Sequence, residues 1–336
     1  MDIFIQVLVS GSSAGSIYAL LALGIVLLYK TSKILNFAHG ELGLLGSFIA
    51  YTVFSKFGLP YVLSFLLSLL AAGLISGLLA ILFVKPERKA VAFAAALLAF
   101  GLALAFDLHW IISAVVGAIV LLVAWNRLSK PEGEQGELGL VIVSLGLALA
   151  IQGADALLFG TDNKVLPSLF SKETISFLGA SLSISELLSS FVGIGIMLLL
   201  WLFLNKTKIG LAMRAVAQSE EIARAMGIPV RTVMFAAWAA SAILAAAAAS
   251  LLIPKTLLAP GVMLGDLSKA FVASVIGGMT SLPGAILGGY ILGILEVVIG
   301  YYINAELQAS FAFLVVILVL IFRPHGILGE PEIKRV

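Results

Sequence analysis

Long apolar runs, separated by short polar or charged stretches, occupy most of the sequence. A helix crosses the hydrocarbon core of a bilayer in roughly 20 apolar residues. With that length as the guide, the pattern predicts eleven spans and therefore an all-α, polytopic transmembrane helical bundle. The predicted spans are residues 4–29, 36–55, 60–84, 90–107, 110–126, 138–159, 184–204, 232–253, 265–280, 284–302 and 306–322.

Three of these spans are short, so the expected total is nine to eleven. Residues 90–126 form one apolar run that is too long for a single crossing and is interrupted at Asp107, which predicts an extra transmembrane hairpin. Residues 265–280 open with Asp266 and Lys269 and are either a span or a re-entrant segment.

Composition supports the same class of protein. The chain is 61% apolar and 11% charged, whereas a soluble domain has about 45–50% apolar and 25% charged residues. A soluble fold could not hide this much apolar surface, so residues 1–336 are expected to form a single transmembrane domain in the cell (inner or plasma) membrane. The absence of cysteine, the three scattered histidines and the net charge of +2 argue against a metal site, a cofactor and nucleic-acid binding.

Basic residues indicate the orientation, because they concentrate on the cytoplasmic side of membrane proteins. With the N-terminus outside and the C-terminus inside, fifteen of the 20 lysines and arginines fall on the inner side. The five on the outer side are Lys56, Lys164, Lys172, Lys255 and Lys269. The sequence therefore predicts an N-out, C-in topology.

Two connections are long: the polar residues 160–183, outside, and the highly charged residues 205–231, inside. In the inner loop, Ser219 is a good N-cap for a helix over 220–226, and Gly227 is a suitable C-terminal stop. Another short helical piece, over 210–217, precedes it. The residues alone leave two interpretations open: a docking site for a partner, or a connector whose basic residues meet anionic membrane lipid.

A second distinctive stretch, NFAHGE (36–41), places polar and ionisable residues at the start of a span. Such residues are costly at membrane depth and usually face a cavity or a partner. Since His39 and Glu41 are two residues apart, they do not share a helix face and do not form a simple metal site. The alternative interpretation is that Asn36 and His39 cap a helix end at the inner interface.

Glycines four residues apart recur within the spans. Such pairs allow close approach of helix backbones in lipid, although membrane helices are also glycine-rich in general. The pairs are Gly11/Gly15, Gly73/Gly77, Gly284/Gly288 and Gly289/Gly293.

The run GLAMRAVAQSEEIARAMGI (210–228) resembles the coupling loop of ABC-transporter permeases, and most closely that of branched-chain amino acid (Liv-type) importers. NFAHGE resembles the N-terminal signature of the same family. The resemblance continues, in the family's order, through residues 11–29, 138–162, 273–296 and 322–330. Residues 85–137 depart from it, because they are longer than the family's connection at this point.

This resemblance implies a permease subunit that forms the translocation path for branched-chain or related amino acids, while a partner hydrolyses ATP. The chain has no G-x-x-x-x-G-K-[ST] motif, so it is expected to be a transport subunit and not an enzyme. The implied partners are cytoplasmic ABC ATPase subunits, a second related permease in a heterodimer or homodimer, and an extracytoplasmic solute-binding protein. Family members also carry other amino acids, urea and amides, and no residue here separates these substrates.

The resemblance also implies roles for individual residues. The expected ATPase-coupling residues are Arg214, Ser219, Glu220, Glu221, Ala223, Arg224 and Gly227. The expected translocation-path and signature residues are Asn36, Phe37, His39, Gly40, Glu41, Gly277 and Gly278.

The competing function is a stand-alone secondary transporter or channel for a small polar solute, which would carry acids in mid-span. The acids of this chain fall near predicted span ends on or toward the outer side, which weighs against that function. They are Asp155, Glu186, Asp266, Glu296 and Glu306.

Overall fold

The computed structural model describes residues 2–83, 137–167, 170, 173–177 and 180–329. The hairpin predicted over 90–126 lies outside these residues. Nine long or medium helices occur in the described residues, one at the position of each of the other nine predicted spans. They are α1 (Asp2–Ser32), α2 (His39–Phe57), α3 (Tyr61–Phe83), α6 (Glu137–Phe159), α7 (Ile184–Lys206), α10 (Val230–Leu252), α11 (Leu264–Gly277), α12 (Leu282–Tyr302) and α13 (Gln308–Phe322).

Four shorter helical elements connect the long ones: α8 (Lys208–Gln218), α9 (Glu220–Ala225), η1 (Ile253–Lys255) and η2 (Ala305–Leu307). Within the described residues, five helices are long and apolar enough to cross a membrane: α1, α3, α7, α10 extended through η1, and α12. In contrast, α11 has only 14 residues, which is about 21 Å of helix. Since this is shorter than the hydrocarbon core, α11 fits the re-entrant alternative better than a full crossing.

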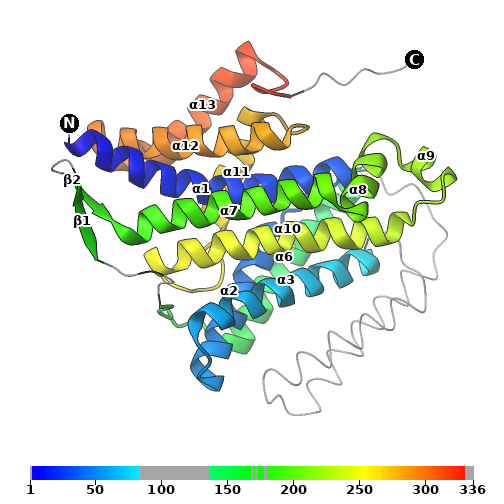
Figure 1. Ribbon diagram of the computed structural model, residues 1–336, viewed down its shortest axis with the longest axis horizontal. Coiled ribbons are helices and arrows are strands. Elements are labelled where there is room, and N and C mark those ends of the chain that lie inside the picture. Colours follow the sequence, from blue (N-terminus) through cyan, green and yellow to red (C-terminus); the bar gives the residue numbers. More distant parts are fainter. Residues whose placement is uncertain (1, 84–136, 168–169, 171–172, 178–179, 330–336) are drawn as a thin grey trace.

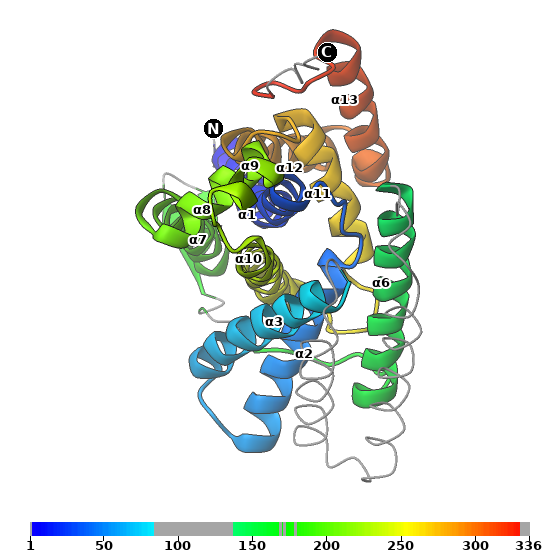
Figure 2. The ribbon, with the colours of Figure 1, turned by 90° about the vertical axis from the view of Figure 1, so that its right-hand side faces the viewer.

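Helix α1 lies at the centre of the bundle. It packs against α7, α10, α11 and α12, and seen end-on these helices surround it, while α2 and α3 lie on the far side of α10 and α6 lies at the edge of the bundle (Figure 2). Ala19, Leu20, Leu21 and Ala22 are completely buried. A helix that is apolar all round is expected to occupy such a central position.

Close contact between α1 and α12 depends on the predicted glycine pairs. The two helices run antiparallel, and a Cβ added at Gly15 would lie 2.8 Å from the Cα of Tyr290. A Cβ at Gly293 would overlap the backbone of Gly11 and Gly15, and one at Gly289 would overlap Ala19. The backbones therefore touch along this line, as the spacing of the glycines predicted.

The other two glycine pairs also lie at helix contacts. Gly73 and Gly77 of α3 face Ile243 and Phe235 of α10. Gly284 and Gly288 of α12 face the backbone of α11 near its C-terminal end. In lipid, where apolar helices gain nothing from leaving water, this close packing is what holds helices together.

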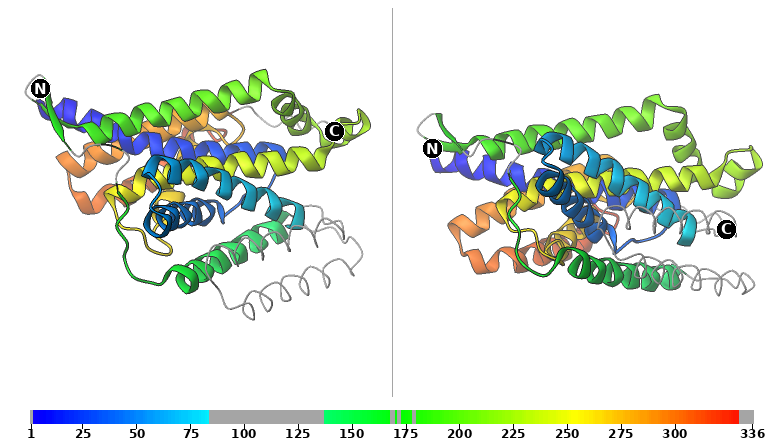
Figure 3. Two further views of the ribbon diagram at one scale, coloured as in Figure 1. Left: turned by 60° about the horizontal axis from the view of Figure 1, so that its bottom comes forward. Right: turned by 90° about the horizontal axis from the view of Figure 1, so that it is seen from below.

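The two ends of the bundle differ. The α1 N-terminus lies at one end beside a β-hairpin of β1 (Thr174–Phe177) and β2 (Ala180–Ser183), and α8 and α9 lie at the opposite end (Figures 1 and 3). The hairpin was not predicted. Its strands have only four residues each, which is too short for an alternation of polar and apolar residues to be recognised within a polar loop. The same loop pairs with the connection after η1, since Lys164 and Leu258 exchange two backbone hydrogen bonds of 2.9 Å.

We predict that Gly293→Ala destabilises the bundle by about 1–3 kcal/mol, because the added methyl group must push α12 away from α1. The matched control is Gly195→Ala in α7, where a Cβ meets nothing within 4 Å. Since alanine is the better helix former, this control should be neutral or stabilise by up to about 1 kcal/mol. Thermal unfolding of the purified protein in detergent measures both, and equal melting temperatures for the two variants would contradict the prediction.

Candidate functional site

The segment over 205–231 folds into two short helices at the end of the bundle opposite the hairpin (Figure 1). At the start of α8, the Thr207 side chain accepts a hydrogen bond from the Gly210 backbone N–H at 3.0 Å. Arg214 donates to the Asn205 side chain at 3.2 Å, which ties α8 to the end of α7. The predicted helical piece over 210–217 is therefore present and is extended at both ends.

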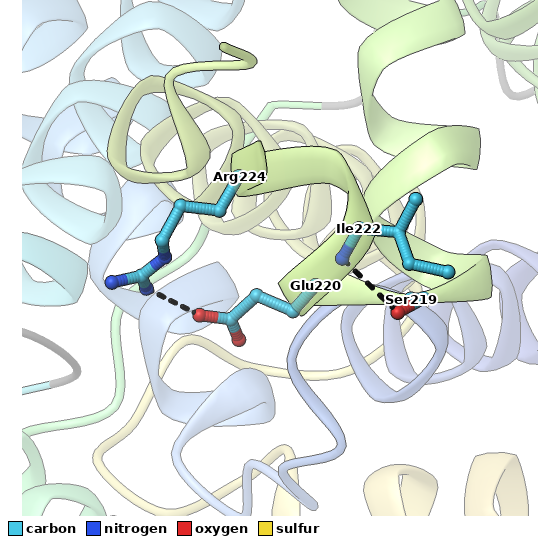
Figure 4. A network of polar contacts seen from close by, with 4 residues as sticks. All are labelled: Ser219, Glu220, Ile222 and Arg224. Atoms are coloured by element: carbon cyan, nitrogen blue, oxygen red, sulfur yellow. Dashed lines mark hydrogen bonds and ion pairs between the residues drawn. The ribbon is translucent and has the colours of Figure 1, made fainter. Parts of the chain in front are cut away.

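Helix α9 has the predicted caps. Ser219 accepts a hydrogen bond from the Ile222 backbone N–H at 3.3 Å, and Arg224 pairs with Glu220 at 2.7 Å (Figure 4). Gly227 has a φ of +79°, and the Ile228 N–H bonds to the Ala223 carbonyl at 3.0 Å, which is a Schellman-type ending. The helix ends at Ala225, one residue earlier than predicted.

One face of these two helices is buried and the other is exposed. Met213 and Val216 of α8 and Ala223 of α9 are buried, and α8 packs against α1, α7 and α10. On the outer side, Ile222 is 67% and Met226 is 77% exposed. The structure therefore presents a capped helix, anchored on the bundle, with apolar side chains directed away from the protein.

An open depression of about 710 Å³ lies beside α9 and is lined by Glu220, Glu221, Arg224 and Ala225. Three of the predicted coupling residues thus lie together at one surface. The other predicted residues of α9 hold that surface in place, through the caps of Ser219 and Gly227 and the buried side of Ala223.

The second predicted set begins at Asn36, whose side chain accepts a hydrogen bond from the Ala38 N–H at 2.9 Å. His39, the first residue of α2, shares a 3.0 Å hydrogen bond between its Nδ1 and the Ser241 hydroxyl, which also lies 3.0 Å from the Gly24 carbonyl oxygen. Ser241 is the central residue of the 23-residue α10. Asn36 and His39 therefore lie at a helix start, as in the alternative interpretation, and this start lies within the bundle, against the middle of α10.

The beginning of α2 also contacts α11. The ring of Phe37 stacks on that of Phe271, with centroids 4.9 Å apart. A Cβ at Gly40 would lie 3.3 Å from Leu267, near the N-terminal end of α11. These residues belong to one interior region with His39.

Gly277 and Gly278 lie elsewhere, at the C-terminal end of α11. Gly278 has a φ of +106° in the turn toward α12. The Leu328 N–H donates to the Gly277 carbonyl at 3.0 Å, so that the segment after α13 covers this turn. The structure thus does not bring these two glycines together with the residues of NFAHGE.

An ion pair that the sequence did not predict links three helices. Lys269 of α11 donates to Glu296 of α12 at 2.5 Å and to the Tyr18 hydroxyl of α1 at 3.1 Å. Glu296 is only 8% exposed. The opposite charges of Lys269 and Glu296, on neighbouring spans, could have indicated this pair. From the sequence, however, Glu296 is expected near the end of a span. In the part of the chain that the structure describes, no group of three or more His, Asp or Glu side chains could hold a metal ion.

A multi-pass bundle of apolar helices, with an anchored helix exposed at one end and polar residues in its interior, is the architecture of a polytopic membrane protein. The sequence of the chain matches the family model described as "Branched-chain amino acid transport system / permease component" over residues 7–321. The chain belongs to this family, as the resemblance of its motifs had indicated. It is thus a permease component of a transport system and a multi-pass protein of the cell membrane.

Curated relatives cover nearly the whole chain. The high-affinity branched-chain amino acid transport system permease proteins BraD of Pseudomonas aeruginosa and LivH of Escherichia coli are each 30% identical to it, over 99% of this chain and 98% of the relative. A probable branched-chain amino acid transport permease protein LivH of Methanocaldococcus jannaschii is 32% identical over 94% of this chain and 89% of the relative. No solved structure matches the chain significantly.

We predict that Glu296→Ala destabilises the bundle by about 2 kcal/mol, because it leaves the largely buried Lys269 ammonium group without its carboxylate. Replacing both members, as Lys269→Met with Glu296→Leu, should recover most of that loss. Denaturation in detergent tests the pair of variants. A double variant that is as unstable as the single one would show that Glu296 acts through another contact.

Proposed function

We propose that the chain is the membrane-spanning subunit of an ABC importer for branched-chain or related amino acids, and that residues 205–231 form its cytoplasmic coupling segment. The observation that carries this proposal is the capped and anchored α9, with exposed apolar side chains at the end of the bundle. Membership of a permease family and the names of the relatives support the transported substrate class.

In such an importer the ATPase has to be a separate subunit, because this chain has no phosphate-binding loop of the Walker type. A six-residue helix such as α9 is too short to be stable alone, so its caps and the buried Ala223 have to hold it in a defined position. Exposed Ile222 and Met226, rimmed by Glu220, Glu221 and Arg224, match the apolar core and polar rim of a protein interface. An ATPase subunit is the proposed occupant, in place of the alternative contact with anionic lipid.

Force applied at α9 would reach the bundle through α8, which packs on α1, α7 and α10. A second, related permease would complete the path, as a heterodimer or a homodimer. With the N-terminus outside, the loops joined at Lys164 and Leu258 face the extracytoplasmic solute-binding protein. Because they form one connected surface, contact with that protein can act on both α6 and α11.

We predict that Ile222→Asp, or Glu220→Lys with Glu221→Lys, lowers ATP-dependent leucine uptake at least about tenfold, since loss of a central contact commonly costs 2 kcal/mol or more of binding. Insertion and folding should be unchanged, because the altered side chains point away from the bundle. The measurements are uptake into proteoliposomes with the complete transporter, and the amount of ATPase that copurifies.

Ile175→Asp is the matched control. Ile175 is also an exposed apolar residue, but it lies in the β-hairpin at the opposite end of the bundle, so ATPase copurification should be as in the wild type. Normal uptake in both α9 variants would refute the assignment of the coupling segment. A purified complex that contains no ATPase, and whose transport ignores ATP, would refute the proposed importer.

A further inference from the structure

Two carboxylates in the interior of the bundle have no hydrogen-bond partner among the described residues. Glu41, in the first turn of α2, is 1% exposed, and Asp155, near the end of α6, is fully buried. All four carboxylate oxygens are without a partner. The two groups are close enough for the charge of Glu41 to act on Asp155. Asp155 does lie near the end of α6, as predicted, but its side chain is buried in the bundle and does not reach the surface.

Packing of α2 on α6 brings the two acids together. Ala38 and Leu42 of α2 lie in one buried cluster with Ala148 and Ile151 of α6. Farther along, the rings of Phe48 and Phe159 stack with centroids 4.5 Å apart. Glu41 precedes Leu42, and Asp155 follows Ile151 by one turn, so the acids occupy neighbouring positions at this contact.

The N-terminal end of α11 reaches the same place. Gly40, next to Glu41, packs against Leu267 and Met263. Gln152, one turn before Asp155, directs its side-chain amide at Gly261, just ahead of α11. Three segments that begin or end within the bundle therefore converge on the two acids.

No cation from the described residues balances this charge. Lys269, the ammonium group nearest along α11, is already bound to Glu296 and Tyr18. A buried carboxylate without a partner is costly, and two of them beside each other repel as well. Such a pair is compatible with a stable bundle only if it holds a proton or receives a cation from outside.

We propose that Glu41 and Asp155 form a binding site for the α-ammonium group of the transported amino acid. An ammonium group carries one positive charge and three N–H donors, and the two carboxylates offer four acceptor oxygens in a region that water does not reach. Charge-assisted hydrogen bonds of this kind are roughly twice as strong as hydrogen bonds between neutral groups. The inference rests on the proposed function, because it needs an amino acid as substrate.

The first test is equilibrium binding of L-leucine to the complete transporter in lipid nanodiscs without the solute-binding protein. Glu41→Gln and Asp155→Asn keep the size of each side chain but remove its charge, and each should weaken leucine binding by about tenfold or more. The matched control is Asp162→Asn, an exposed acid just beyond α6, which should bind leucine as the wild type does. Wild-type affinity in both interior variants overturns the proposal.

The second test uses the unaltered protein, so it does not depend on the folding of a variant. Dicyclohexylcarbodiimide, a hydrophobic reagent, reacts with protonated carboxyl groups, and mass spectrometry identifies the labelled residues. L-Leucine should protect Glu41 and Asp155, whereas 4-methylpentanoate, which is leucine without its ammonium group, should not. If labelling of Glu41 and Asp155 is the same with and without leucine, the pair holds only a proton, and the proposal is overturned.

The carboxylate site and the proposed importer can be refuted separately. A wild-type complex that imports leucine with ATP but shows neither effect refutes the carboxylate site alone. If transport is independent of ATP, the proposed importer is refuted, and leucine binding and protection still decide the carboxylate site.

Discussion

Contact between the backbones of α1 and α12 is the constraint on which the arrangement of the other helices depends. Apolar helices in lipid are already in an apolar solvent, so association has to come from close packing. Gly15 and Gly293 permit this, because neither places a side chain between the two helices. With α12 against it, and with α7, α10 and α11 completing the ring, α1 becomes the fixed axis of the bundle.

The parts of the fold that the sequence predicted are those set by local rules. Each span has to satisfy its own backbone hydrogen bonds, so length and hydropathy were sufficient to locate nine helices. Ser219 and Gly227 act within a single turn of helix, and the ends of α9 were accordingly predicted to within one residue. In contrast, the depth of His39 depends on Ser241, 202 residues away, and no local pattern contains that information. The burial of Asp155 was missed for the same reason, since it depends on how α2 and α11 cover the end of α6.

Polar groups inside the bundle are of two physical kinds. His39 with Ser241, and Lys269 with Glu296 and Tyr18, are bonded to one another, and hydrogen bonds of this kind between helices hold them in a defined geometry. Glu41 and Asp155 lie in the same interior, but the part of the chain that the structure describes gives them no hydrogen-bond partner. Lys269 and Glu296 balance each other's charge, whereas the two acids have no partner among the described residues, so they differ from the structural contacts around them.

Helix α10 connects the surface of the bundle to that interior. Its N-terminal end packs beside α8 and α9, and Ser241, 11 residues later, lies about 17 Å along the helix axis. An α-helix transmits displacement along its axis with little loss, so a shift of α10 at the α9 end moves Ser241 as well. His39 is bonded to Ser241 and begins α2, whose first turn carries Glu41. Two contacts therefore separate the proposed coupling segment from the two carboxylates, and a movement of α10 changes the surroundings of these carboxylates unless the His39–Ser241 bond breaks.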